Sequence, residues 1–200
     1  HFEYIDVDGY YFNEYGGKFH RTKMLNDMAR VCSTEFIFNW DADIIMPPMQ
    51  ILNAVNQLRD GSEIIFPYSE YVRISRNEII PFRDNADIGD LKAGKDVLPH
   101  AVGGAIGFNR TVFIKGGMEN EKFISYGAED VERVVRFKKL GFKIECVKGN
   151  LYHINHFCGT NSGCNHPDYE ANEKEFAVIK NLSKPQLESY IKAWPWILKT

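Results

Sequence analysis

The stretch Glu35-Phe-Ile-Phe-Asn-Trp-Asp-Ala-Asp43 decides the fold class of this chain. Its first six residues form a short, largely apolar run rich in aromatic rings, which is typical of a buried central strand because a helix needs more residues. The run ends on two aspartates, and the end of a parallel strand is where open α/β sheets bind their ligands. We therefore expect a strand here, with ligand-binding residues directly after it.

Amphipathic helices are predicted on both sides of this strand. Apolar residues recur at helical spacing over residues 20–30, and again after Pro47-Pro48, where prolines suit the start of a helix. Strand-like runs at residues 2–8 and 63–66 complete an alternation of strand and helix. This alternation predicts right-handed crossovers and an α/β fold with a mostly parallel sheet flanked by helices.

The later elements are predicted by the same periodicity and turn signals. Residues 68–100 are largely irregular, and a long polar insert in a compact domain is more often a functional loop than an accident. The other expected elements are strands at 71–74, 103–108, 142–147 and 151–157, a short helix from 109, and helices at 130–140, 169–182 and 186–193.

The composition is that of an ordinary globular domain. The chain has 200 residues, of which 44% are hydrophobic and 26% charged, and 24 basic against 27 acidic residues leave a net charge of −3. It lacks the basic surplus that nucleic-acid binding requires and the run of about 20 apolar residues that a membrane span requires. Four cysteines without a C-x-x-C pair argue against a zinc ribbon and leave Cys158 and Cys164 as the only plausible disulfide. We expect a soluble protein without a nucleic-acid partner.

Asp41 and Asp43 are the first candidate site residues. On an extended chain, residues i and i+2 point the same way about 6.6 Å apart, so both carboxylates can share one divalent cation. Oxygen ligands suit Mg²⁺ or Mn²⁺, and such a cation would neutralise a diphosphate bound to an acidic protein. A strand-end turn with two solvated aspartates explains the same pattern equally well.

Two further motifs carry glycines and carboxylates. Gly103 and Gly104 begin a run with three glycines in five residues, which allows a second backbone or a sugar to approach closely, or simply marks a bulge. Glu129 and Asp130 follow a turn of small residues at the start of a predicted helix, where one of them can accept a proton from a hydroxyl. In isolation they are better explained as ordinary first-turn residues.

Histidines occur in the run Tyr152-His153-Ile-Asn-His156, and His166 lies further on. Strand alternation would place His153 and His156 on opposite faces, so the two need not serve one site. A neutral imidazole can complete the ligand shell of an aspartate-bound Mn²⁺, although a single histidine in a strand is more often structural.

Taken in order, these motifs resemble those of a GT-A glycosyltransferase of the galactosyltransferase type, a branch that is also similar to bacterial chondroitin-polymerase and polypeptide GalNAc-transferase domains. Phe19-His-Arg-Thr-Lys-Met-Leu-Asn26 resembles the family's F-N-R-A-K-L-L-N, and the strand with its D-x-D follows at the right interval. The segment 103–117 resembles the family's glycine-rich segment, residues 123–130 resemble W-G-W-G-G-E-D, and Tyr152-His153 resembles the late metal histidine. The resemblance covers about residues 2–157.

The resemblance implies a metal site and a donor site. Asp41, Asp43 and His153 would hold Mn²⁺ or Mg²⁺ on the donor diphosphate, with His156 as a substitute ligand. The implied donor-binding residues are Phe19, Arg21, Asp41, Gly103 and Gly104.

The implied reaction moves a hexose or N-acetylhexosamine from a UDP-sugar to a hydroxyl of a glycan or glycolipid, with inversion, in polysaccharide or glycoconjugate synthesis. Asp130 would be the general base, and Glu129 would hold the acceptor or the sugar. Tyr126, expected at the acceptor, stands where the family has tryptophan, and Ala128 stands where it has the second glycine. The family's acceptor stacking and donor-sugar preference therefore cannot be assigned to this chain.

The expected organisation is one GT-A-like catalytic domain over residues 1–200, with a C-terminal helical extension at 168–200. The family begins with an apolar strand that leads into the nucleobase loop, and no residues ahead of His1 supply it. We therefore expect that strand to be lacking and sugar nucleotide to bind weakly. The absence of an apolar anchor leads us to expect a bacterial cytoplasmic enzyme, peripheral to the inner membrane at most.

Two alternatives stay open. One is a catalytically degenerate carbohydrate-binding module of the same fold, which would keep an aromatic groove without the chemistry. The other is a haloacid-dehalogenase-like phosphatase, which also places Asp-x-Asp after a strand and would use Asp41 as its nucleophile. The phosphatase leaves the glycine-rich and Glu-Asp segments unexplained.

Overall fold

A computed structural model of the chain describes residues 18–75, 77–85, 88, 91, 96–98, 101–157, 159 and 163–197. The strand expected at residues 2–8 and Cys158 of the suggested disulfide lie outside these residues. The helices are α1 (Arg21–Val31), α2 (Pro48–Arg59), α3 (Ile79–Asn85), α4 (Arg110–Lys115), α5 (Glu129–Leu140), α6 (Tyr169–Asn181) and α7 (Lys184–Lys192). The strands are β1 (Phe36–Trp40), β2 (Ile44–Ile45), β3 (Ile64–Phe66), β4 (Glu70–Ile74), β5 (Val97–Leu98), β6 (Ala105–Asn109), β7 (Ile144–Cys146) and β8 (Asn150–Ile154).

Local sequence signals explain where several helices begin and end. α2 begins at Pro48, where the missing N–H costs no hydrogen bond. The Asn109 side chain accepts a hydrogen bond from the Thr111 N–H and so caps α4. Gly141 ends α5 with a left-handed φ of 97°. α3, β2 and β5 were not expected, because they are short or lie in the segment that reads as irregular.

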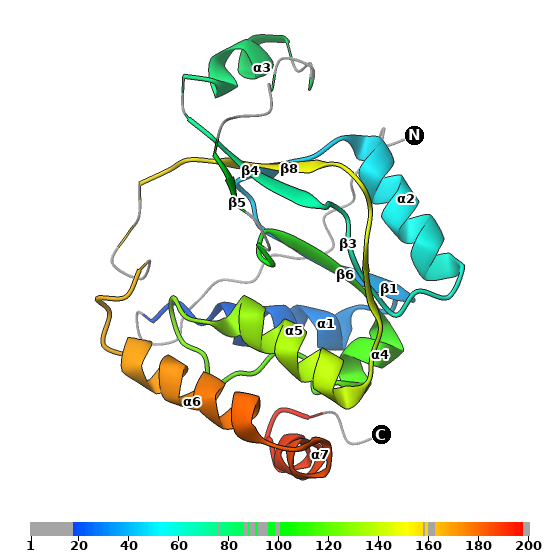
Figure 1. The fold of residues 1–200 in the computed structure, drawn as a ribbon, viewed down its shortest axis with the longest axis vertical. Coiled ribbons are helices and arrows are strands. Elements are labelled where there is room, and N and C mark those ends of the chain that lie inside the picture. Colours follow the sequence, from blue (N-terminus) through cyan, green and yellow to red (C-terminus); the bar gives the residue numbers. More distant parts are fainter. Residues whose placement is uncertain are drawn as a thin grey trace.

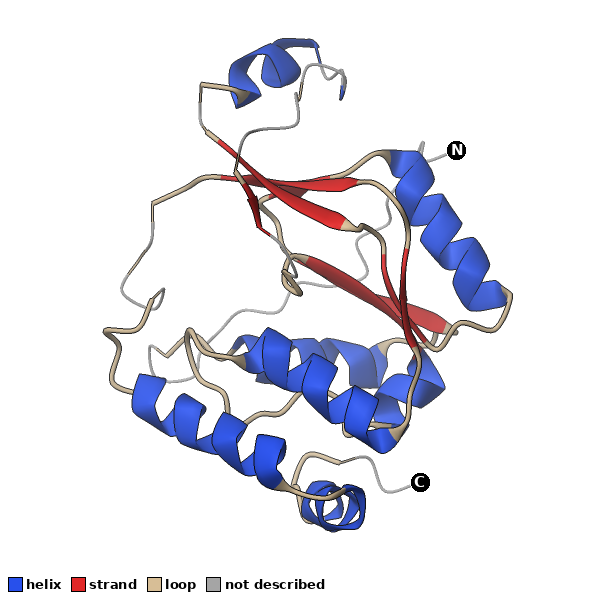
Figure 2. Cartoon of the chain, viewed as in Figure 1, coloured by secondary structure: helices blue, strands red, loops and turns tan. Residues whose placement is uncertain are grey.

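The described strands form two four-stranded sheets of mixed direction (Figure 2). The first has the order β1-β6-β3-β7, in which β6 runs antiparallel to both neighbours and β7 runs parallel to β3. The expectation of a mostly parallel sheet is therefore wrong. β1 and β3 do run in the same direction, as a crossover through α2 requires, but β6 enters between them from a distant part of the chain and runs the opposite way.

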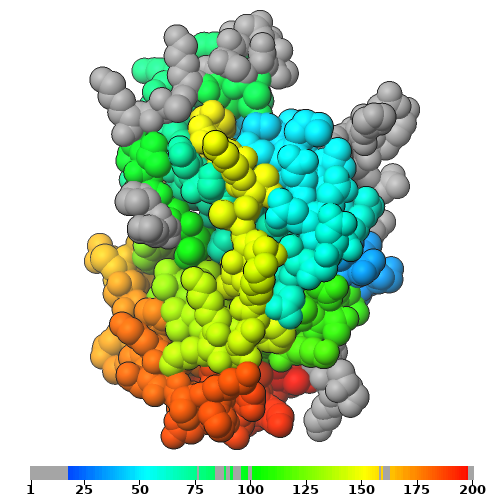
Figure 3. Space-filling model, turned by 45° about the vertical axis from the view of Figure 1, so that its right-hand side comes forward, coloured from blue at the N-terminus to red at the C-terminus, as the bar shows by residue number. Residues whose placement is uncertain are grey.

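The second sheet has the order β2-β8-β4-β5 and continues the first. The parallel pair β3/β7 leads directly into the parallel pair β4/β8, and Ser69 donates its N–H to the Gly149 carbonyl (2.9 Å) where the sheets meet. The buried Gln50 side chain of α2 fills this bend and donates to the carbonyls of Pro67 (2.9 Å) and Asn150 (3.2 Å). The segment around residue 150, yellow in Figure 3, lies at the surface beside α2.

Helices cover both faces of the first sheet. α1, α4 and α5 lie on one side and α2 on the other, while α3 stands apart at the far end of the second sheet (Figure 1). Side chains of β3 alternate between these layers, because Ile64 packs on the first side and Ile65 on the α2 side. Large buried members of the main core are Phe108, Phe113, Phe137, Met118 and Leu151.

The two C-terminal helices pack outside α5. Their buried cluster contains Ile179, Leu187, Ile191 and Trp194, and Leu140 of α5 packs against it. A capping box between Ser183 and Gln186 starts α7. Across the part of the chain that the structure describes, no helix has the length and apolar character needed to cross a bilayer.

Candidate active site

The loop after β1 lies at the junction of the two sheets. Asp41 donates its backbone N–H to the carbonyl of Gly104 (2.8 Å), and the carbonyl of Asp43 accepts from the N–H of Ile154 (2.8 Å). These bonds hold the loop between the segment that enters β6 and the end of β8. Both aspartates therefore lie beside elements that carry other candidate residues.

Asp43, His153 and His156 form a cluster of potential metal ligands. One ligand atom from each lies within 4.8 Å of the others. The Nε2 atoms of His153 and His156 are 3.3 Å and 2.8 Å from Oδ2 of Asp43. The two histidines thus reach one carboxylate, contrary to the expectation from strand alternation, because β8 ends at Ile154 and alternation no longer applies at His156.

The hydrogen bonds of this cluster fit a bound cation. Nδ1 of His156 lies 3.0 Å from the Phe157 carbonyl, and a carbonyl only accepts, so Nδ1 carries the proton. Nε2 of the same ring faces Oδ2 of Asp43, and either a second ring proton or a metal ion must lie between these two atoms. Oδ1 of Asp43 and Nδ1 of His153 are buried and have no hydrogen-bond partner among the described residues. Stacking on Tyr71, at 5.6 Å between ring centroids, fixes the orientation of His153.

Asp41 is paired with an arginine instead of joining the histidines. Its Oδ1 accepts from Arg21 at 2.7 Å, and among the described residues it is not part of the ligand cluster. The chain turns at residues 42 and 43, so the i and i+2 side chains no longer point the same way as they would on an extended strand. The structure therefore brings Asp43, but not Asp41, to the histidines.

Arg21 joins Asp41 to Asp130, whose Oδ1 lies 3.3 Å from the guanidinium. Burial opposes the charge of Arg21, but the carboxylates of Asp130 and Asp41 outweigh it and raise its pKa above the ordinary value. Arg21 is thus a fixed positive charge between two candidate site residues from different elements.

Gly103 and Gly104 are required for different reasons. A Cβ on Gly103 would lie 2.9 Å from Oδ2 of Asp130, so the glycine allows that carboxylate to approach the backbone. Gly104 has a φ of +85°, which favours glycine, and a Cβ there would lie 2.9 Å from a methyl of Leu151. Tyr68 also donates its hydroxyl to the Gly103 carbonyl (2.5 Å).

The two carboxylates at the start of α5 have opposite pKa shifts. Burial, and then the charge of Asp130, raise the pKa of Glu129 to about 7. Burial also acts to raise the pKa of Asp130, but Arg133 and Arg21 outweigh it, so that the pKa of Asp130 lies below its ordinary value. At neutral pH Asp130 is therefore charged, and Glu129 is partly protonated.

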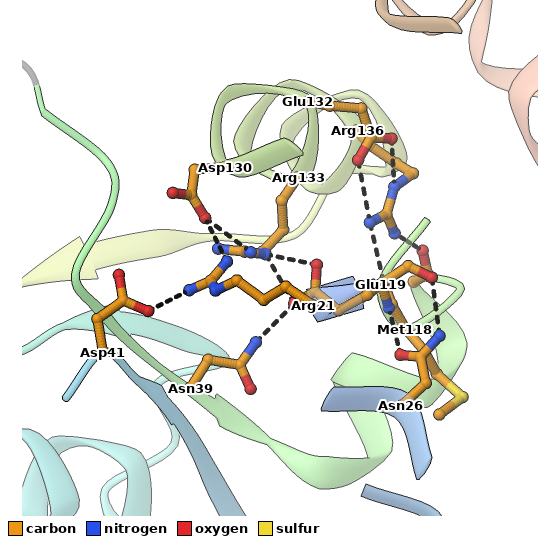
Figure 4. A network of polar contacts seen from close by, with 11 residues as sticks. Arg21, Asn26, Asn39, Asp41, Met118, Glu119, Asp130, Glu132, Arg133 and Arg136 are labelled. Atoms are coloured by element: carbon orange, nitrogen blue, oxygen red, sulfur yellow. Dashed lines mark hydrogen bonds and ion pairs between the residues drawn. The ribbon is translucent and has the colours of Figure 1, made fainter. Parts of the chain in front are cut away.

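A buried network behind Asp130 contains residues that the sequence reading did not single out (Figure 4). Arg133 of α5 is within 2.9 Å of both Asp130 and Glu119, and Glu119 accepts from Asn39 of β1 (2.5 Å). The sequence predicts a charged amphipathic helix over residues 130–140, in which Arg133 is only 1% exposed. The spacing of Arg133 three residues after Asp130 is the one sequence signal for this contact.

The remaining candidate residues lie near the start of α1 and the turn before α5. The carbonyl of Phe19 accepts from the N–H of Ser125 in this turn (2.7 Å), and Phe19 is exposed. Tyr126 is 50% exposed and stacks on Tyr169 of α6, with 6.4 Å between ring centroids and 12° between planes. His166 contacts the Tyr126 carbonyl (2.5 Å) and lies outside the metal-ligand cluster.

Residues 93–158 match the family model described as the N-terminal domain of galactosyltransferase. The match supports a glycosyltransferase of the galactosyltransferase type. It covers about a third of the chain and includes the Gly103-Gly104 pair, the Glu129-Asp130 pair and both histidines of the ligand cluster. A search among curated proteins finds no match to the chain.

Proposed function

We propose that this chain is a metal-dependent glycosyltransferase that moves a hexose or N-acetylhexosamine from a UDP-sugar to a hydroxyl of a glycan or glycolipid, with inversion. One observation carries the proposal. At the junction of the two sheets, the segment that matches the galactosyltransferase model supplies two histidines to a cluster that can hold a metal ion. A GT-A architecture and a role in polysaccharide or glycoconjugate synthesis are part of the same proposal.

Asp43, His153 and His156 would hold the metal ion. Two imidazole nitrogens beside one carboxylate favour Mn²⁺ over Mg²⁺, which prefers oxygen ligands throughout. A bound metal ion would act as a Lewis acid for the departing diphosphate. Arg21, with its raised pKa, adds a fixed positive charge beside Asp41 on the side where the nucleotide would lie, so a donor can bind without a basic surface.

Asp130 would be the general base. It is charged at neutral pH and lies against Gly103, beside which the donor sugar would sit. Glu129, which is partly protonated near neutral pH, would donate a hydrogen bond to the sugar or the acceptor. The exposed Tyr126 ring, stacked on the half-buried Tyr169, would present a flat apolar face to an acceptor sugar ring.

The test compares the wild type with Asp130→Asn in a transfer assay with UDP-sugars, Mn²⁺ and glycan acceptors. We expect the variant to lose at least about 100-fold in turnover, because general-base catalysis contributes this much or more, while it keeps Mn²⁺ and donor binding. Glycan binding without metal and without turnover in the wild type would instead favour the degenerate binding module. Hydrolysis of a generic phosphate ester that is lost in Asp41→Asn would favour the phosphatase. The anomeric configuration of the product, read by NMR, tests inversion.

A further inference from the structure

We propose that Arg133 is a positioning residue for Asp130: it holds the carboxylate against Gly103 from inside the protein, and it is itself held in place by Glu119. The inference rests on the proposed function only in giving Asp130 the role of base. The position of the carboxylate can be tested without any substrate.

The two guanidinium groups at Asp130 differ in their surroundings. The Arg133 side chain is 1% exposed and contacts Oδ1 of Asp130 at 2.9 Å, one helical turn away on the same helix. The Arg21 side chain is 18% exposed, contacts the same oxygen at 3.3 Å, and is shared with Asp41. A donor diphosphate bound near Asp41 would compete for Arg21, whereas Arg133 is out of reach of solvent and ligand.

Arg133 is anchored by Glu119, which is itself held by β1 and α1. Its Nε lies 2.9 Å from the carboxylate of Glu119, which also accepts from Asn39 of β1. The backbone N–H of Glu119 donates to the side chain of Asn26 of α1 (2.8 Å), and its carbonyl accepts from the same side chain (3.0 Å). The Asn26 bonds fix the backbone of Glu119, and its buried carboxylate cannot rotate away without leaving Arg133 and Asn39 unpaired. The guanidinium of Arg133 is therefore fixed, and so is the oxygen that it binds.

A second buried arginine holds the turn that presents Glu119. Met118 has a backbone φ of 62°, which residues other than glycine rarely adopt, and its carbonyl accepts from Arg136 (2.8 Å). Arg136 also contacts the Gly116 carbonyl and forms an ion pair with Glu132 (2.7 Å). Arg136 is as buried as Arg133, but its hydrogen-bond partners among the described residues are Glu132 and the carbonyls of residues 116 and 118 and do not include Asp130, so it offers a matched control.

The charges around Asp130 decide what the loss of Arg133 would do. The groups that interact with Asp130 are Arg21 from α1, Arg133 and Glu129 from α5, Tyr68 after β3 and Tyr71 from β4, and Asp41 after β1 shares Arg21 with it. Arg133 contributes more than Arg21 to lowering the pKa of Asp130 against the effect of burial. Without Arg133, burial and Glu129 oppose the charge of Asp130, and of its two arginines only Arg21 is left to stabilise it, so the pKa of Asp130 would rise.

The experiment measures the titration of Asp130 by NMR in the full chain labelled with ¹³C-aspartate, with the resonance assigned by Asp130→Asn. The test variant is Arg133→Met/Glu119→Gln, which removes both charges of the buried pair. The control is Arg136→Met/Glu132→Gln, which removes an equally buried pair on the same helix. We expect the Asp130 midpoint to rise by about one pH unit or more in the test variant, and by clearly less in the control, which keeps both Arg133 and Glu119.

An unchanged midpoint in a folded test variant, or an equal rise in both variants, would overturn the inference. If the test variant does not fold, Arg133→Lys replaces it: the charge is kept but the two-sided contact is lost, so we expect a wild-type midpoint with turnover at least about 10-fold lower. Wild-type turnover in that variant would overturn the inference. A midpoint that rises as expected in a protein with no transferase activity would support the positioning role and refute the proposed function instead.

Discussion

At the residue scale, Asp41 and Asp43 lie two positions apart and have different partners. Asp43 meets both histidines, and Asp41 is already neutralised by Arg21. We predict that Asp43→Asn lowers Mn²⁺ affinity by roughly 100-fold, because it removes a ligand, whereas Asp41→Asn lowers it by less than about 10-fold. Isothermal titration with Mn²⁺, without nucleotide, measures both. Equal losses in the two variants would mean that Asp41 is a ligand after all.

Glu129 makes stability depend on pH in a defined direction. Its pKa is raised from an ordinary 4.5 to about 7, so the folded protein binds this proton more tightly than the unfolded chain does. Its contribution is fully present below about pH 4.5 and is lost as the pH rises through about 7. Relative to Glu129→Gln, the wild type should lose roughly 2 kcal/mol of unfolding free energy between about pH 5 and about pH 8. Urea unfolding at both pH values checks this, and a parallel change in the two proteins would show that Glu129 does not titrate in this range.

The candidate residues differ in how far the sequence could predict them. Asp43, Asp130 and the histidines stand beside recognisable turns and strand ends, so their types and positions were informative. Arg133 and Glu119 were not, because the partners of this buried ion pair are 14 positions apart in the sequence, where each looks like an ordinary solvated charge. The environment of Asp41 could not be predicted either, because it depends on the turn at residues 42 and 43 and on Arg21 of α1.

At the element scale, the two glycines ahead of β6 should respond differently to alanine. Gly104→Ala places a residue with a Cβ in a left-handed backbone conformation and should cost about 1 kcal/mol or more of stability. Gly103→Ala has no such strain and instead places a methyl against the Asp130 carboxylate, so it should lower transferase turnover by about 10-fold or more while costing less stability. Thermal unfolding and turnover measured together separate the two effects. Full turnover in Gly103→Ala would contradict the proposal that Asp130 acts from its position against Gly103.

Periodicity predicted the longer elements well and the pairing of strands poorly. α1, α2 and α5 lie where apolar residues recur at helical spacing, because that spacing reports a local property of the chain. The insertion of β6 between β1 and β3 is a long-range event that leaves no mark on the local sequence of any of them. The two-residue strands β2 and β5 exist only through their partners, so no local pattern could reveal them.

At the scale of the whole molecule, α6 and α7 are tied to the body by a buried apolar cluster and by polar contacts. Asn172 of α6 donates to the carbonyls of Ile124 and Tyr126 beside the candidate site (2.8 Å each). We predict that Leu187→Ala, at a fully buried position, costs roughly 2–5 kcal/mol of stability and leaves a single cooperative unfolding transition. Urea unfolding followed by circular dichroism and tryptophan fluorescence tests this. Two separate transitions would show that the C-terminal helices fold as an independent unit.

The central claim is that this chain transfers a sugar from a nucleotide donor with the help of a metal ion held by Asp43 and the two histidines. The most direct measurement is the release of nucleoside diphosphate from a panel of UDP-sugars, with glycan acceptors present, in Mn²⁺ and in EDTA. We predict release with at least one donor in Mn²⁺, its loss in EDTA, and its loss in Asp43→Asn. Release that is equal in EDTA, or unaffected by Asp43→Asn, would contradict the account.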